Sequence, residues 1–300
     1  MMKYIERLNY DSKITIKLVI PSGCNAKCEF CYMKDYNDIM KNDKGEFLNN
    51  FIPSLECLLS EINNADKVSL DITGNEPTYD VELLKEVLIK LNKFDIQSKV
   101  SRVTITTNGL NLKKVYPWFG GVINYVNISV HHYDKNERDY IFGCKTTPDY
   151  EYFDIVSKLR RNGITVSAIC VVYKPIYNFH QFMNNFIEWC KQIGFISIRF
   201  RNDVFWKETE FEEYMNIALS DNTFTIVQNE DTLDSRWCRL KMNDKFRVFF
   251  LSGVKDTSLV VKGIEYVVAD DGMTYTDFYK REKIENYPFT IGKVYDIIEE

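Results

Sequence analysis

The sequence has little of several features that would place it in common protein classes. Its 300 residues contain 3 histidines and no apolar run of the roughly eighteen residues that a membrane span requires. No apolar stretch of signal-peptide length follows Met1, and basic residues do not exceed acidic ones, 38 against 43, which gives a net charge of −5. An acidic chain disfavours a nucleic-acid backbone as its main partner. We therefore expect a cytoplasmic protein with neither a membrane nor a nucleic acid as its partner.

Cysteines are few and mostly isolated. Of the 8 cysteines, five stand singly in apolar surroundings, as reduced core thiols do. These five are Cys57, Cys144, Cys170, Cys190 and Cys238. This scatter argues against a disulfide framework and against a second, auxiliary metal cluster. The other three, Cys24, Cys28 and Cys31, have the spacing C-x3-C-x2-C and directly follow an apolar run.

Three thiolates on so short a loop can bind one iron–sulfur cube and leave its fourth iron without a protein ligand. Two other kinds of site compete with this interpretation. A zinc site normally takes four protein ligands, or three and a water, often with histidine, and His131, His132 and His180 lie far from the cysteines in sequence. A four-cysteine electron-transfer cluster needs a fourth cysteine nearby, and the next one, Cys57, follows a long polar stretch. We therefore favour a cluster with one open iron.

The apolar pattern predicts an α/β fold. Six strand-like segments, most of them followed by a helical pattern, indicate a parallel sheet with right-handed crossovers. The expected strands are residues 14–20, 67–73, 102–107, 125–130, 165–173 and 195–201, and the expected helices are residues 53–62, 81–91, 150–161 and 178–192. In the second of these helices the leucines and valine at 83, 84, 87, 88 and 91 form one stripe.

Side chains alternate between apolar and polar along five of the strands. In residues 68–73, for example, Ser69, Asp71 and Thr73 alternate with apolar neighbours. A doubly wound sheet, which is buried on both faces, would be continuously apolar instead. The alternation therefore predicts a curved, partial (βα)6 TIM-like barrel with helices on its apolar face, a polar lumen, and a site at the C-terminal ends of the strands.

The pattern changes after residue 202. A short helix at 211–219 and β-rich segments at 245–251, 258–261 and 264–268, with a turn at 271–272, predict a mixed α/β extension. We expect residues 1–202 to form the barrel core, and residues 203–300 to cover the barrel mouth and select the substrate.

The loop Ser22–Tyr32 resembles the cluster loop of the radical S-adenosylmethionine (radical SAM) superfamily. This resemblance implies a [4Fe-4S] cluster bound by Cys24, Cys28 and Cys31, with S-adenosylmethionine (SAM) chelated on the free iron. It places Phe30, between the second and third cysteines, beside the SAM adenine. The resemblance covers roughly residues 15–202 and implies the same partial barrel that the alternation predicts.

The segment 74–77, Gly-Asn-Glu-Pro, is similar to the Gly-Gly-Glu-Pro segment of the same superfamily. By this resemblance, backbone groups at Gly74 and Asn75 and the acid Glu76 receive the SAM ammonium. Glycine allows the backbone to approach closely, and asparagine tolerates left-handed dihedrals better than most residues. Asn108 and Ser129, at the ends of the third and fourth strands, match positions that contact the SAM ribose or carboxylate. An ordinary βα turn and capping residues are the alternative interpretation of all five positions.

Three further residues are expected to point into the lumen by alternation. His131 is predicted to be either a substrate contact or a structural histidine. Arg199 and Arg201 both lie on the polar face of the last strand, so Arg199 is expected to pair with Asp71 or with an acceptor on a neighbouring strand. Arg201, nearer the strand end, is expected to bind an anionic group of SAM or of the substrate.

These features together predict an enzyme that cleaves SAM reductively and uses the 5′-deoxyadenosyl radical to abstract hydrogen from an organic substrate. We expect a peptide or a small natural-product precursor as the substrate, and an electron donor of the flavodoxin or ferredoxin type as a partner. An activase of a glycyl-radical enzyme is an alternative, and a non-enzymatic iron–sulfur regulator or electron carrier is another.

Overall fold

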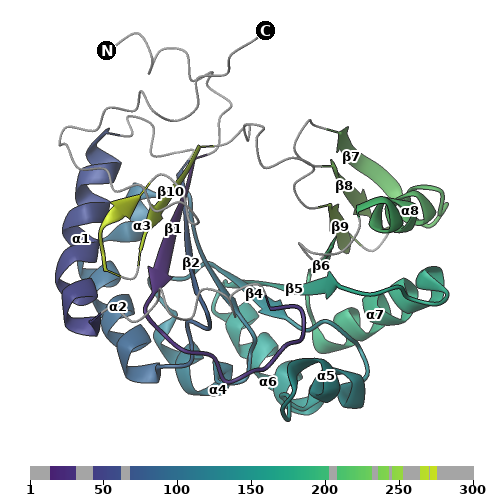
Figure 1. The fold of residues 1–300 in the computed structure, drawn as a ribbon, viewed down its shortest axis with the longest axis horizontal. Helices are drawn as coiled ribbons and strands as arrows, with labels where there is room; N and C mark the ends of the chain where they lie inside the picture. Colours follow the sequence, from purple (N-terminus) through teal and green to yellow (C-terminus); the bar gives the residue numbers. More distant parts are fainter. Residues whose placement is uncertain are drawn as a thin grey trace, which may run out of the picture.

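The computed structural model describes residues 14–31, 43–61, 68–202, 208–231, 236–242, 245–252, 264–269 and 271–275. Within these residues, eleven strands form a single sheet in the order β11-β10-β1-β2-β3-β4-β5-β6-β9-β8-β7. Figure 1 shows that this sheet curves strongly, with helices along its outer side. The structure therefore has the TIM-like α/β architecture that the sequence predicts.

Six parallel strands form the centre of the sheet. They are β1 (Ile14–Ile20), β2 (Val68–Gly74), β3 (Arg102–Thr107), β4 (Tyr125–Ser129), β5 (Thr165–Val172) and β6 (Ser197–Asn202). Consecutive strands are neighbours throughout, with Ile14 opposite Val68 in the first pair and Ala168 opposite Ile198 in the last. All six coincide with the predicted strands to within two residues at either end.

The helices lie on the outer side of the sheet. They are α1 (Lys44–Glu61), α2 (Val81–Lys93), α3 (Ile96–Lys99), α4 (Leu112–Val115), the 3₁₀ turn η4 (Tyr116–Trp118), α5 (Lys135–Phe142), α6 (Asp149–Arg161), α7 (Phe179–Ile193) and α8 (Glu208–Leu219). The stripe predicted on α2 is confirmed, because all five of its apolar residues are buried. Asp80 caps this helix by accepting a hydrogen bond from the backbone N–H of Leu83 at 3.0 Å.

Helix α1 corrects one expectation. The sequence predicts a helix that begins near Pro53 after a long loop, whereas α1 begins at Lys44 and contains Pro53 in its interior. The physical reason is the spacing of Phe47, Phe51, Leu55 and Leu58, four buried side chains that lie on one face of a continuous helix. Packing of this face against the sheet offsets the backbone hydrogen bond that proline cannot donate.

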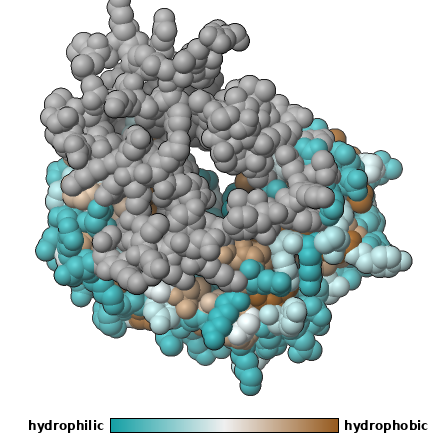
Figure 2. All heavy atoms as spheres, in the orientation of Figure 1, coloured by the Kyte–Doolittle hydropathy of each residue, from teal (hydrophilic) through white to brown (hydrophobic). Residues whose placement is uncertain are grey.

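The two faces of the sheet differ as predicted. Residues such as Leu18, Ile72, Ile105, Ile128 and Phe200 alternate onto the outer face and are fully buried under the helices. The opposite face, which we call the inner face, carries Asp71, Thr104, Asn127, Ser167 and Arg199. The large apolar core lies between the sheet and its helices. On the coloured part of the surface in Figure 2, hydrophilic residues prevail along the rim.

The C-terminal part of the chain extends the sheet at both edges. Strand β9 (Arg247–Leu251) adds in parallel to β6, and β8 (Arg236–Lys241) and β7 (Thr225–Asp231) follow in antiparallel order. At the other edge β10 (Ile264–Val268) adds in parallel to β1, and β11 (Thr274–Tyr275) pairs with β10. The strand predicted at 258–261 lies outside the described residues. Among the helices of the described part of the chain, none is long and apolar enough to cross a membrane.

Candidate active site at the C-terminal ends of the strands

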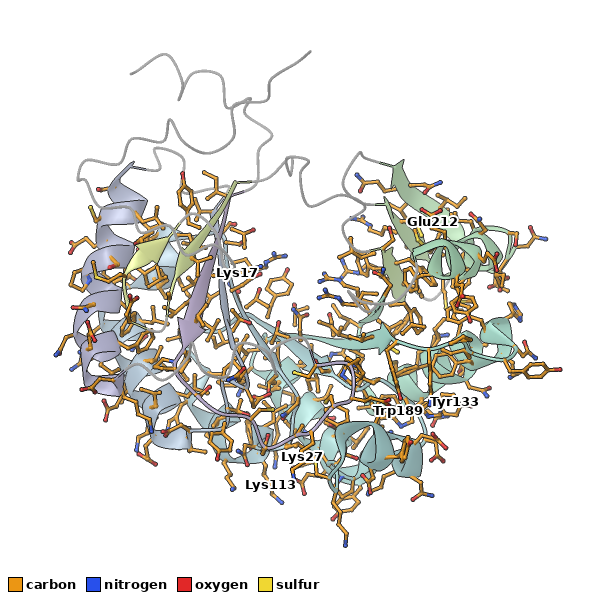
Figure 3. All side chains as sticks on the ribbon, viewed as in Figure 1. Lys17, Lys27, Lys113, Tyr133, Trp189 and Glu212 are labelled. Carbon is orange, nitrogen blue, oxygen red and sulfur yellow. The ribbon has the colours of Figure 1, made fainter. Side chains whose placement is uncertain are left out.

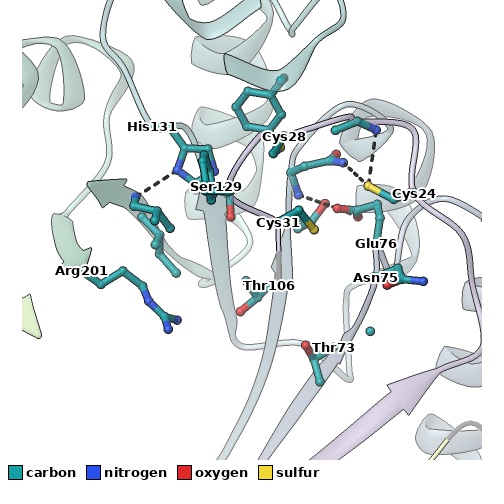
Figure 4. A pocket seen from close by; sticks show the side chains of 18 of the residues that line it. Cys24, Cys28, Cys31, Thr73, Asn75, Glu76, Thr106, Ser129, His131 and Arg201 are labelled. Carbon is teal, nitrogen blue, oxygen red and sulfur yellow. Dashed lines mark hydrogen bonds between the residues drawn. The ribbon is translucent and has the colours of Figure 1, made fainter. Parts of the chain in front are cut away.

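A pocket lies where the cysteine loop meets the C-terminal ends of β2 to β6 (Figure 4). Its empty volume is about 950 Å³, with open solvent at the mouth included. It is lined by Cys24, Ala26, Cys28, Phe30, Cys31, Thr73, Gly74, Asn75, Glu76, Thr106, Thr107, Asn108, Ser129, His131, Phe142, Ile169, Val171, Arg201 and Asn202. Eleven of the twelve residues predicted for the site, Arg201 among them, thus line this pocket. Arg199 is not part of this wall.

Gly74 brings the end of β2 close to the end of β1. Its φ is +142°, and a Cβ on this residue would lie 2.7 Å from the carbonyl oxygen of Ile20, which is backbone and cannot move aside cheaply. Only glycine fits this approach without strain. Asn75 is not among the non-glycine residues with positive φ in the described chain. The backbone of Asn75 is therefore not left-handed, and the expected advantage of asparagine at this position does not apply.

Glu76 is buried and binds four donors of its own chain. Oε1 accepts hydrogen bonds from the Thr78 N–H at 2.9 Å, the Thr78 hydroxyl at 2.6 Å and the Thr107 hydroxyl at 2.6 Å. Oε2 accepts one from the Asn108 N–H at 2.6 Å. Burial raises the pKa of Glu76, and these donors oppose that rise because they stabilise the carboxylate. Glu76 therefore ties the end of β2 to the end of β3 beneath the pocket.

Side-chain amides attach the cysteine loop to these strand ends. Asn75 donates from Nδ2 to the Ser22 carbonyl at 3.1 Å, and the Ser22 hydroxyl donates to the Glu76 carbonyl at 2.8 Å. Asn108 donates from Nδ2 to Asn25 Oδ1 at 2.8 Å and lies 3.7 Å from Cys24 Sγ. Asn108, directly after β3, thus helps to fix the position of Cys24, although the two residues are far apart in sequence.

The three thiols line one wall of the pocket and influence one another. Burial, followed by the charges of Glu76 and Cys31, raises the pKa of Cys24 to about 11. Burial, followed by the charges of Cys31 and Cys24, raises the pKa of Cys28 to about 12. Iron binding would release these protons, because the thiolate is the ligand. Among the described residues, no three metal-binding side chains are already drawn together at ligand distances. The donor set nonetheless fits a [4Fe-4S] cluster in kind and number, since three sulfur atoms face a shared space.

Aromatic rings form the wall beside the cysteines. The Phe30 ring lies 4.7 Å from that of Tyr173 and 4.9 Å from that of His131, and His131 stacks on Phe142 at 5.0 Å. The Phe142 carbonyl accepts a hydrogen bond of 2.7 Å from the Lys27 N–H, so helix α5 supports the cysteine loop. The Phe30 and His131 planes are nearly perpendicular, at 86°, so this apolar wall presents both ring faces and ring edges. Aromatic rings can contact a planar base in either way, and the role of Phe30 beside the adenine stays a prediction.

His131 is held in an unusual backbone conformation. Its φ is +60°, and its Nδ1 accepts a hydrogen bond of 3.0 Å from the Val171 N–H. Burial, and secondarily the charge of Arg201, lowers the pKa of His131 to about 3. The ring is therefore neutral near pH 7, with its proton on Nε2. Its inward orientation is as predicted, whereas its role as a substrate contact remains a prediction.

Replacing His131 by asparagine should flatten the dependence of stability on pH. The unfolded chain protonates this ring near its ordinary pKa of 6.5, whereas the folded chain does so near 3. Stability from the neutral ring is present above pH 6.5 and is lost as pH falls toward 3. From pH 7 to pH 5 we expect the wild type to lose about 2 kcal/mol more than His131→Asn, which keeps an acceptor and tolerates positive φ. Urea unfolding at both pH values measures this, and equal losses in the two proteins would contradict it.

The two arginines of β6 differ from each other. Arg201 lies across the pocket from Cys24 in Figure 4, as expected. Arg199 is exposed, with its guanidinium 5.9 Å from the Phe249 ring, and no ion pair with Asp71 is found among the described residues. The predicted pairing is therefore wrong. Burial raises the pKa of Asp71 despite nearby basic groups, which makes it a poor counter-ion.

Several other residues can now be placed. Tyr133 packs outside the pocket against Phe182, and Cys238 is buried on the outer face beside Phe250. The sequence did not single out Thr107 and Phe142, which hold Glu76 and the aromatic wall. For Thr107 a signal existed, since it directly precedes Asn108 at a strand end. For Phe142 there was none, because the short helix that carries it was not predicted.

The fold and the pocket define a TIM-like α/β protein in which three cysteines and an aromatic wall meet at the C-terminal ends of the parallel strands. The sequence model of the radical SAM superfamily matches residues 18–185, which is more than half of the chain. The chain therefore belongs to the radical SAM superfamily, whose members bind a [4Fe-4S] cluster and SAM.

Two curated relatives show a similar but partial match. The GTP 3′,8-cyclase of Clostridium perfringens (strain SM101 / Type A) is 26% identical over 43% of this chain and 36% of its own length. The S-adenosylmethionine-dependent nucleotide dehydratase of Fibrobacter sp. (strain UWH6) is 25% identical over 57% of this chain and 50% of its own length. The chain thus matches half or less of these relatives.

Solved structures show the same fold. SuiB of Streptococcus suis bound to S-adenosylmethionine superimposes with a TM-score of 0.58 over 92% of this chain and 63% of its own, at 13% identity. SuiB bound to the precursor peptide SuiA gives a TM-score of 0.52 over 72% of this chain and 48% of its own, at 15% identity. At these identities the similarity concerns the fold.

Proposed function

We propose that this enzyme cleaves SAM reductively in the pocket described above and abstracts hydrogen from an organic substrate. The observation that carries the proposal is the meeting of Cys24, Cys28 and Cys31 with the segment around Gly74 in one pocket. When bound, the reduced cluster would supply the electron that splits SAM into methionine and the 5′-deoxyadenosyl radical. The chain would bind and orient SAM and the substrate and exclude water from them.

Each wall has a proposed role. The backbone at Gly74 and Asn75 would bind the SAM ammonium, while Glu76 would position this segment, because its oxygens already accept four hydrogen bonds. Phe30 would stack on the adenine, and Asn108 and Ser129 would lie near the ribose or carboxylate. Arg201 would bind an anionic group, since its charge has no carboxylate partner among the described ion pairs. We propose that residues 203–300 contribute to substrate selection.

The substrate is proposed to be a small molecule or a peptide. SuiB, with which this chain shares its fold, was solved with a precursor peptide, and the two curated relatives are named for GTP and for a nucleotide. A nucleotide is therefore the small-molecule class that the relatives suggest. The electron donor is proposed to be of the flavodoxin or ferredoxin type. No feature of the pocket favours the activase or the iron–sulfur regulator specifically.

The test is the formation of 5′-deoxyadenosine. The anaerobically reconstituted protein is incubated with SAM and dithionite, and nucleosides are separated by chromatography. We expect 5′-deoxyadenosine from the wild type and none when either SAM or dithionite is omitted. A protein that carries a full cluster yet gives no 5′-deoxyadenosine would be a regulator or electron carrier, and the proposal would be wrong.

A further inference from the structure

Five basic side chains share the inner face of three neighbouring strands. Arg199 of β6 lies opposite Phe249 of β9, which in turn lies opposite Arg239 of β8. In the neighbouring row Arg247 lies opposite Lys241. Since residues opposite one another in adjacent strands point to the same side, these rows and Arg201 form one surface. This basic face consists of Arg199, Arg201, Arg239, Lys241 and Arg247, and Figure 3 shows nitrogen-bearing side chains on the inner side of β8 and β9.

Among the described residues, the basic face has no acidic ion-pair partner. None of the ion pairs found among the described residues includes a member of this face. The Nε atom of Arg239 is buried and has no hydrogen-bond acceptor. A buried donor without an acceptor is costly and is normally satisfied by the protein, by ordered water or by a bound group; here it adds to the unpaired charges of the same face. The whole chain has a net charge of −5, and the positive charge here is therefore local.

Like charges crowd this surface. Arg199 is accessible to solvent but lies on the concave inner face of the sheet, where partial desolvation, followed by the positive charges of Arg201 and Arg102, lowers its pKa. Asp71 opposes this change only weakly, as the last of the causes, and its own pKa is raised. An anion on this face would relieve the repulsion between the guanidinium groups. Several charges are needed, because a single carboxylate would leave most of the face unpaired.

The basic face is continuous with the pocket. Arg201 lines the pocket wall, and Arg199 precedes it by two residues on the same strand, β6. Strand β9 lies beside β6, and β8 lies beside β9. A molecule whose anionic end rests on the basic face therefore has its other end at the pocket, where the SAM-derived radical would form. The site therefore suits an elongated substrate that carries its negative charges at one end.

We propose that the substrate is a nucleoside triphosphate whose phosphates bind the basic face and whose sugar and base extend toward the pocket. This inference rests on the proposed function for the pocket itself. Guanidinium groups match phosphate oxygens with paired hydrogen bonds, and a polyphosphate concentrates the several negative charges that the face requires. An acidic peptide is the competing occupant, and its charges would be spread along an extended chain.

Equilibrium binding tests the inference without turnover. The reconstituted protein with SAM, but without reductant, is titrated calorimetrically with ATP, CTP, GTP and UTP, with the corresponding nucleosides, and with a glutamate-rich peptide. We expect at least one triphosphate to bind at least about a hundredfold more tightly than its nucleoside, and more weakly as salt rises. Arg239→Gln with Arg247→Gln should weaken that binding by about a hundredfold, since each charged hydrogen bond contributes about a factor of ten or more.

The control is a pair of exposed basic residues on the outer helices, Lys93→Gln with Arg161→Gln, which removes the same charge and should leave binding unchanged. No binding by any triphosphate, equal binding by its nucleoside, or tighter binding of the peptide would overturn the inference. The nucleoside comparison uses the wild type and does not depend on folding of a variant. Formation of 5′-deoxyadenosine without triphosphate binding would refute this inference alone, whereas triphosphate binding without 5′-deoxyadenosine would refute the proposed function alone.

Discussion

Replacement of Cys24, Cys28 and Cys31 together by alanine is expected to abolish the iron–sulfur chromophore of the reconstituted protein and its formation of 5′-deoxyadenosine. The three thiols line one pocket wall, and no other cysteine does. Cys170, Cys190 and Cys238 are buried in the apolar core and cannot reach the pocket without unfolding. Absorbance in the visible region and iron and sulfide content measure the loss.

The matched control is Cys144→Ala. This thiol is half-buried and close enough that its charge contributes to the raised pKa of Cys28, although it lies outside the motif. The variant should bind as much iron as the wild type. A full cluster in the triple variant, or its loss in Cys144→Ala with the fold intact, would contradict the assignment of the ligands.

Glu76→Ala is expected to lower the free energy of unfolding by about 3–5 kcal/mol, because it removes the acceptor of four hydrogen bonds in a buried place. The Thr78 and Asn108 backbone N–H groups would keep no partner there. The ends of β2 and β3 would separate, so we also expect weaker SAM binding. Urea unfolding of the protein without its cluster measures the first effect, and calorimetry of the reconstituted protein measures the second.

Asp80→Ala provides the comparison for this prediction. Asp80 is an acid on the same segment, but it caps α2 near the surface and contacts Lys44 and the Leu83 N–H. Its removal should cost about 1 kcal/mol, as expected for a helix cap. Equal destabilisation by the two substitutions would show that the Glu76 network contributes little beyond a surface cap.

Much of the barrel could be predicted from the sequence because its determinants are local. Alternation along residues 68–73 is set by a two-residue period, and the stripe on α2 by a helical one, so each segment indicates its own structure and its buried face. The position of the cysteine loop follows from its place directly after β1. Parallel strands bring their C-terminal ends to one edge, which explains why the predicted residues meet in one pocket.

What could not be predicted depends on contacts between distant segments. The strands β9 and β10 find their neighbours β6 and β1 at opposite edges of the sheet, and no local pattern specifies such pairing. Arg199 was expected to meet Asp71 because both alternate onto the inner face, but alternation fixes the side of a strand and not the distance across a curved sheet. The start of α1 was missed for a different reason: Pro53 was read as a helix start, although the helical spacing of Phe47, Phe51 and Leu55 is itself a local signal for a longer helix.

The central claim is that the three cysteines bind a cluster whose open iron holds SAM in this pocket. Electron paramagnetic resonance of the reduced cluster, recorded with and without SAM labelled by nitrogen-15 at its amino group, tests it most directly. The account predicts that SAM changes the spectrum and that the labelled nitrogen shows hyperfine coupling to the cluster. A spectrum that SAM leaves unchanged, in a protein with its full content of iron and sulfide, would contradict the account.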